Sequence, residues 1–99
     1  MVIVTGSIQA RVDTLEELRR LSLEHVARSR TEPGCLEHGV AIDANDALRL
    51  IFFERWEDEG ALRAHFRVPA AREFASRAAA LAAHPPTLSA YEASDLPLR

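Results

Sequence analysis

The chain has 99 residues, of which 47% are hydrophobic and 27% are charged, and its formal net charge is −3. This composition predicts one folded domain, residues 1–99, rather than a disordered segment, and the negative balance argues against a nucleic-acid partner. No apolar stretch approaches the about 20 residues that cross a membrane, and no basic leader of a signal peptide is visible. We therefore expect a cytoplasmic protein without a membrane partner. Cys35 is the single cysteine, so no intrachain disulfide is possible.

The first two predicted elements are a strand and a helix. Residues 2–10 are rich in β-branched side chains and predict a strand, which Gly6 interrupts. Asp13 and Thr14 are both candidates for the helix cap, because each precedes a glutamate by three residues, the spacing of a capping box. The helix is expected to end before Pro33, since proline disfavours helical geometry in the residue that precedes it.

An antiparallel hairpin is predicted for residues 35–56, with residues 44–47 in a connecting loop of four or five residues. Its first strand places Leu36, His38, Val40 and Ile42 on one face and Cys35 on the other. Its second strand is apolar on both faces: Leu50, Phe52 and Trp56 alternate with Ile51 and Phe53. A sheet with one solvated face would alternate apolar and polar residues. We therefore expect helices on one face and a second subunit on the other, in a homodimer.

The remaining residues predict two helices and a strand. Asp58 can cap a short helix that ends at His65 or Phe66, and Pro69 suits the first turn of another helix. That helix must end before the two prolines at 85–86, and residues 87–93 form a last strand. The order β-α-β-β-α-β predicts a ferredoxin-like α+β fold: a four-stranded antiparallel sheet with helices on one face.

Three motifs together resemble the antibiotic biosynthesis monooxygenase family, including its quinol monooxygenase branch. They are the turn EPGCL at residues 32–36, the strand end in which Glu54 and Trp56 form E-x-W, and the helix A-x-x-A-H at residues 61–65. The resemblance covers nearly the whole chain and implies a dimeric α+β barrel with a cavity between sheet and helices in each subunit. It also implies oxidation of a phenol or quinol by O2 without a metal or a cofactor.

Such chemistry needs aromatic walls, a base and hydrogen-bond donors, because a deprotonated phenol can pass one electron to O2 directly. The predicted catalytic residues are His65 as the base, Trp56 as a stacking wall and Glu54 as a partner that orients His65. The predicted substrate-binding residues are Thr5, Ser7, His38, Phe52, Phe66 and Phe74. Each of these side chains also has a structural alternative, as core or as a paired polar group. His25 could face the same surface of the sheet. No metal-ligand spacing or phosphate-binding loop is present, so we expect no metal.

Two other functions remain open at this stage. The same fold and pocket could serve a dimeric, non-catalytic protein that binds a small ligand or responds to stress. They could also serve an isomerase or a lactone-processing enzyme that uses the same histidine, because a fold does not settle a function.

Overall fold

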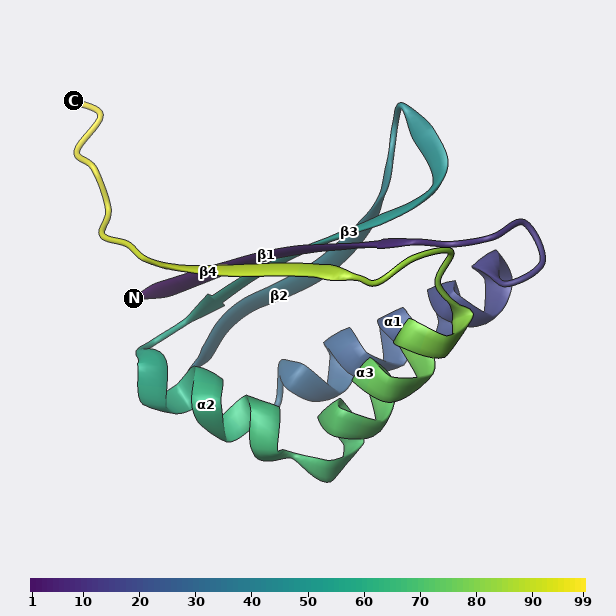
Figure 1. Cartoon of the computed structure of the whole chain (residues 1–99). Helices are drawn as coiled ribbons and strands as arrows, with labels where there is room; N and C mark the ends of the chain where they lie inside the picture. Colours follow the sequence, from purple (N-terminus) through teal and green to yellow (C-terminus); the bar gives the residue numbers. More distant parts are fainter.

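The computed structural model describes residues 1–99 as one sheet covered by three helices. The elements are β1 (Val2–Gln9), α1 (Leu15–Ser29), β2 (Cys35–Asp43), β3 (Asp46–Trp56), α2 (Glu59–Arg67), α3 (Pro69–Leu81) and β4 (Thr87–Glu92). The antiparallel strands lie in the order β2-β3-β1-β4. All three helices lie on one side of this sheet (Figure 1). The predicted ferredoxin-like α+β fold is therefore confirmed. None of the helices is long and apolar enough to cross a lipid bilayer.

The N-terminus of α1 differs from the predicted capping box. Thr14 is the cap residue, but its side chain makes no capping bond to α1. Its hydroxyl instead accepts a bond from the backbone N–H of Arg11 and donates one to the carbonyl of Leu81, at 2.8 Å. Thr14 therefore ties the start of α1 to the end of α3, a contact between distant segments that local spacing does not reveal. By contrast, Asp58 caps α2 as predicted, accepting from the backbone N–H of Ala61.

The β2–β3 hairpin was predicted correctly, but two of its details were wrong. Only Ala44 and Asn45 separate the strands, so the loop is shorter than the four or five residues expected. A register shift between Cys35 and Glu37 marks a bulge at the start of β2. This bulge turns Leu36 to solvent and lets Cys35 pack beside buried Trp56, contrary to the predicted alternation.

The core between sheet and helices is divided into two hydrophobic clusters. The larger one contains Ile8, Ala10, Leu18, Val26, Leu50, Phe52, Ala78 and Ala82. The smaller one contains Val2, Val4, Trp56 and Leu62. Both include residues of the central strands β1 and β3. Between Phe52 and Trp56 on the inner face of β3 comes Glu54, so the apolar row of this strand is interrupted by a charge.

The outer face of the sheet carries no helix (Figure 1). Ile51 and Phe53 of β3 lie on this face, paired with Ser7 and Thr5 of β1. Phe53 is 38% exposed. The two-sided apolar pattern of β3 is therefore real in the single chain, where one of its faces is uncovered.

The turn between α1 and β2 depends on Gly34, whose φ is +81°. A Cβ atom at this position would also lie 2.5 Å from the Cβ of Ala61 in α2. Side chains disfavour this φ, and no normal contact is so short, so only glycine fits. The turn thereby brings Glu32 and Pro33 close to the start of α2.

We predict that Gly34→Ala lowers the free energy of unfolding by about 1–3 kcal/mol, the cost of holding a side chain in a left-handed conformation. Chemical denaturation followed by circular dichroism measures this difference. Gly39→Ala is the matched control, because no heavy atom lies within 4 Å of the position that its methyl group would occupy, and its φ is not positive. Equal losses in the two variants would contradict this explanation.

Candidate functional site

A cavity of about 230 Å³ lies between the inner face of the sheet and the helices. Its walls are mainly apolar and include the three phenylalanines Phe52, Phe66 and Phe74, with small side chains of α3 beside them. Its ionisable lining residues are His25, Glu54, His65 and Arg72. Residues 86–88, at the start of edge strand β4, also line it, and β4 itself is exposed along its whole length. The cavity therefore combines an apolar wall with a cluster of imidazoles and one carboxylate.

His65 is held in this cavity by a carboxylate from a distant part of the sequence. It lies on the same buried face of α2 as Leu62, one turn earlier, and is 4% exposed. Its Nδ1 lies 2.7 Å from Oε1 of Glu32 in the α1–β2 turn. Because an ionised carboxylate only accepts hydrogen bonds, Nδ1 carries the hydrogen, and in the neutral ring Nε2 then presents a lone pair. The pair therefore fixes both the ring orientation and the tautomer of a potential base.

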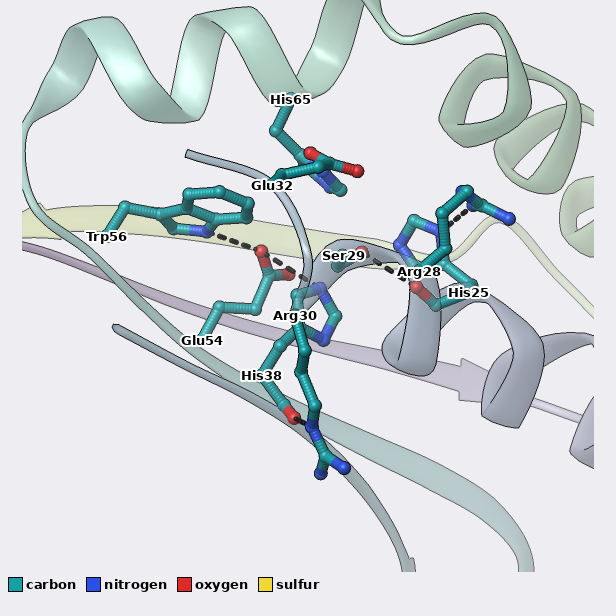
Figure 2. A network of polar contacts seen from close by, with 9 residues as sticks. All are labelled: His25, Arg28, Ser29, Arg30, Glu32, His38, Glu54, Trp56 and His65. Carbon is teal, nitrogen blue, oxygen red and sulfur yellow. Dashed lines mark hydrogen bonds and ion pairs between the residues drawn. The ribbon is translucent and has the colours of Figure 1, made fainter. Parts of the chain in front are cut away.

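Glu54 has different partners from those predicted. Its Oε1 accepts a hydrogen bond from Trp56 Nε1 at 2.9 Å and lies 3.3 Å from His38 Nε2 (Figure 2). Burial raises the pKa of Glu54, but the contacts with His38 and Trp56 and the nearby His65 outweigh burial, so the net pKa lies below its usual value. Glu54 thus remains a buried carboxylate. The predicted role of orienting His65 belongs to Glu32 instead.

Trp56 packs against the site residues but lies outside the lining of the cavity. Its side chain is fully buried and does not line the cavity, so the predicted stacking wall is not at this position. The indole lies 4.7 Å from the His65 ring, centroid to centroid, with the planes inclined by 35°. Trp56 therefore packs against His65 and donates to Glu54, which restricts the positions of both side chains.

Three histidines converge from three elements: His25 from α1, His38 from β2 and His65 from α2 (Figure 2). Their ring centroids are 5.3 Å apart for His25 and His38, 5.3 Å for His25 and His65, and 5.8 Å for His38 and His65. His25 also stacks on Phe74 at 4.1 Å. Burial and the neighbouring His38 and His65, together with Arg28, lower the pKa of His25 to about 3 despite Glu54. His25 is therefore neutral at physiological pH.

The structure brings together most of the side chains predicted as site residues. Those whose side chains line the cavity are Phe52, Glu54, His65, Phe66 and Phe74; Ser7 also borders it, but its side chain lies on the outer face of the sheet, level with Ile51. The hydroxyl of Ser7, however, is engaged with that of Thr87, at 2.8 Å. His38 and Trp56 lie behind the lining. Thr5 lies on the outer face of the sheet, paired with Ser89, so the prediction that it contacts a substrate in this cavity is wrong: strand alternation turns it away.

Two residues of the site were missing from the candidates predicted from sequence. Glu32 was considered only as the residue before Pro33, where the helix ends, although it is the charged residue of the EPGCL motif and that position was a usable signal. His25 was expected only to face the sheet, and its periodic position on α1 could not reveal that it meets two other histidines. Both contacts join elements that are distant in sequence.

The fold and the cavity place the chain among α+β proteins that have a pocket between a ferredoxin-like sheet and its helices. Within this class, the chain belongs to the antibiotic biosynthesis monooxygenase family, whose model matches residues 1–77. This match does not show whether the chain belongs to the quinol monooxygenase branch of the family. The three motifs from the sequence all fall inside the matched region.

Three proteins are similar to this chain over most of its length. An uncharacterized protein of Synechocystis is 32% identical over 94 residues, which are 95% of this chain, and the chain spans 64% of that relative's length. A protein of Deinococcus radiodurans described as a candidate antibiotic biosynthesis monooxygenase has 27% identity and a TM-score of 0.92, covering 97% of this chain and 95% of its own. A Pseudomonas aeruginosa protein has 26% identity and a TM-score of 0.83, and the match covers 95% of this chain and 94% of that protein.

The low pKa of His25 predicts a pH-dependent stability. The folded chain leaves His25 neutral down to about pH 3, whereas the unfolded chain protonates it below about pH 6.5. Because the unfolded state then binds the extra proton, the free energy of unfolding falls as the pH drops through this window, by at most about 1.4 kcal/mol per pH unit. His25→Gln should flatten this slope.

Urea denaturation between about pH 7 and pH 5 measures the effect. His84→Gln is the control, since His84 is exposed and lies outside the cluster. If the pH dependence of the free energy of unfolding is unchanged in His25→Gln, or is reduced equally in His84→Gln, it does not arise from His25.

Proposed function

We propose that this protein is a cofactor-independent monooxygenase that oxidises a small phenol or quinol with O2. Membership of the antibiotic biosynthesis monooxygenase family supports a monooxygenase. The main support for a phenol or quinol substrate is the position of His65. Its Nδ1 is hydrogen-bonded to Glu32, and its ring lines a cavity with aromatic walls. An oriented imidazole beside an apolar slot is suited, in its neutral form, to taking the proton of a phenol.

The size of the cavity supports a substrate of one or two rings. A cavity of about 150 Å³ accommodates benzene, whereas drug-sized ligands occupy about 300–1,000 Å³. At about 230 Å³ the cavity falls between these values. Phe52 and Phe74, which lie edge to face at 6.1 Å, provide flat apolar contacts for an aromatic ring.

The proposed reaction needs no external reductant. His65 takes the hydroxyl proton, and the phenolate passes one electron to O2, giving a phenoxyl radical and superoxide. Recombination forms a carbon–oxygen bond at an unsubstituted para carbon, and His65 returns its proton to the peroxide. The hydroperoxide loses water as its O–O bond breaks and the para C–H proton leaves. The balance is one phenol plus one O2 to one quinone plus one water, and the substrate supplies all four electrons. The apolar walls limit the contact of the radical pair with solvent.

We predict that His65→Ala lowers O2 consumption by roughly 10²- to 10⁴-fold, the usual contribution of a general base. An oxygen electrode with a panel of small quinols and phenols measures the rate. His84→Ala is the matched control and should keep the full rate. A rate that is unchanged in His65→Ala removes this residue from the reaction. If no compound of the panel drives O2 consumption by the unaltered protein, the non-catalytic ligand-binding function is favoured instead.

We also propose that the protein acts as a homodimer joined through the outer faces of two sheets. What supports this is the uncovered apolar surface opposite the helices, where Phe53 and Tyr91 are exposed, Ile3 is paired with Tyr91 and Ile51 lies two residues from Phe53 on β3. Covering these side chains with a second sheet removes apolar area from water without moving a helix.

We predict that Phe53→Asp converts the dimer to a single chain, because it places an unpaired charge in the middle of the joined faces. Light scattering of the unaltered protein should give about twice the 11.0 kDa mass of one chain, and the variant should give 11.0 kDa. Val12→Asp is the control: Val12 is also an exposed apolar residue but precedes α1, away from the sheet. An unaltered protein with the mass of one chain would contradict the proposal.

A further inference from the structure

We propose that His25, His38 and His65 form a binding site for one divalent transition-metal ion of the class that prefers imidazole nitrogen, with Zn²⁺ as its representative. This inference does not rest on the proposed function. It rests on the convergence of the three rings, on a buried histidine without hydrogen-bond partners, and on the carboxylates placed behind the rings.

The first support is distance. One nitrogen from each ring can be chosen so that all three lie within 4.8 Å of one another, and all three side chains are buried. A tetrahedral zinc ion with bonds of about 2.0–2.1 Å places its ligand nitrogens about 3.4 Å apart. Each ligand nitrogen would therefore have to move by roughly 1 Å to reach this geometry.

The second support is the state of His38. Its side chain is almost completely buried, yet neither Nδ1 nor Nε2 makes a hydrogen bond. Nε2 has only the ion-pair contact with Glu54 Oε1 at 3.3 Å, Nδ1 has no partner at all, and Arg30 binds only the backbone carbonyl of His38. Buried polar groups without partners are rare because each costs free energy. A metal ion would supply the missing partner.

The third support is the set of contacts behind the rings. Glu32 accepts from Nδ1 of His65, the carboxylate–histidine arrangement that commonly orients a metal ligand and leaves Nε2 free to bind. Glu54 supplies a second negative charge beside His38, which offsets part of the charge of a cation. No carboxylate has to move toward the rings for either effect.

Arg28 opposes metal binding in the arrangement described. Its Nη2 lies 2.7 Å from His25 Nδ1, so this nitrogen accepts and Nε2 of His25 carries the hydrogen. When Nε2 binds a metal, Nδ1 must carry the hydrogen, and the guanidinium has to turn away. Nε of Arg28 has no hydrogen-bond partner in its present position. Replacing Arg28 should therefore increase the affinity of the site for the metal ion.

The proposed ion has an open coordination position. His25 and His65 both line the cavity, so a fourth ligand can approach from its apolar side. Three protein nitrogens with one open position are the arrangement of many zinc sites that bind water or a substrate oxygen. The ion would use the lone pair of His65 that the proposed base needs, so the metal-loaded form should lack cofactor-independent turnover.

The test is a Zn²⁺ titration by calorimetry of the protein after treatment with a chelator, with Co²⁺ absorption as a report of tetrahedral nitrogen coordination. We expect one ion per chain and a rise in Tm on binding. His25→Gln, His38→Gln and His65→Gln should each weaken binding at least about 10-fold, and Glu32→Gln about 10- to 100-fold, as for other groups that orient ligands. Arg28→Gln should tighten binding, because its amide oxygen can accept from Nδ1 of His25.

His84→Gln is the control and should bind Zn²⁺ like the unaltered protein. Circular dichroism selects the variants that remain folded. If the histidine variants do not fold, the tighter Zn²⁺ binding expected of Arg28→Gln still tests the proposal. The proposal is overturned if the folded protein binds no Zn²⁺ at one per chain, if folded histidine variants bind as well as the unaltered protein, or if His84→Gln loses the same affinity. Oxygen consumption by the metal-free protein is measured separately, so either proposal can fail alone.

Discussion

The site depends on one carboxylate that strand alternation forces into the core. Glu54 lies between Phe52 and Trp56 on the inner face of β3, and neither neighbour can turn it outward without exposing itself. A buried charge without partners costs several kcal/mol. Here the indole of Trp56 donates to it and His38 lies beside it. The polar cluster therefore divides the hydrophobic core in two, and the cavity lies next to that division.

Each polar group of the cluster is placed by a different regular element, which gives the site its rigidity. His25 is carried by α1, His38 by β2, Glu54 by β3 and His65 by α2. Trp56 and Phe74 pack against these rings and limit their rotation. Binding sites built on helices and strands hold their geometry more closely than sites built on loops. The base and the metal ion that we propose would therefore use the same imidazoles in nearly the same place, so the availability of the ion would decide between them.

The fold could be predicted from the sequence because its signals are local. Asp58 caps α2, Pro69 begins α3, and Pro85 and Pro86 follow the end of α3, all as the residue types dictate. The site was harder to predict, because its contacts cross the sequence. The bond between Glu32 and His65 joins residues 33 positions apart, and the bond of Thr14 to Leu81 replaces a local cap. The bulge at Leu36 inverts the expected face of Cys35, and no residue pattern marks it.

The α1–β2 turn has a consequence for how sequences of this kind can vary. Glu32 reaches His65 only because Gly34 closes the turn against Ala61. Inserting or deleting one residue between Thr31 and Gly34 would move the carboxylate of Glu32 out of hydrogen-bonding distance of His65. The hairpin tip at Ala44 and Asn45 bends away from the helices and lines no part of the cavity (Figure 1). A longer tip would therefore leave the cavity unchanged, whereas the turn must keep its length as well as its residues.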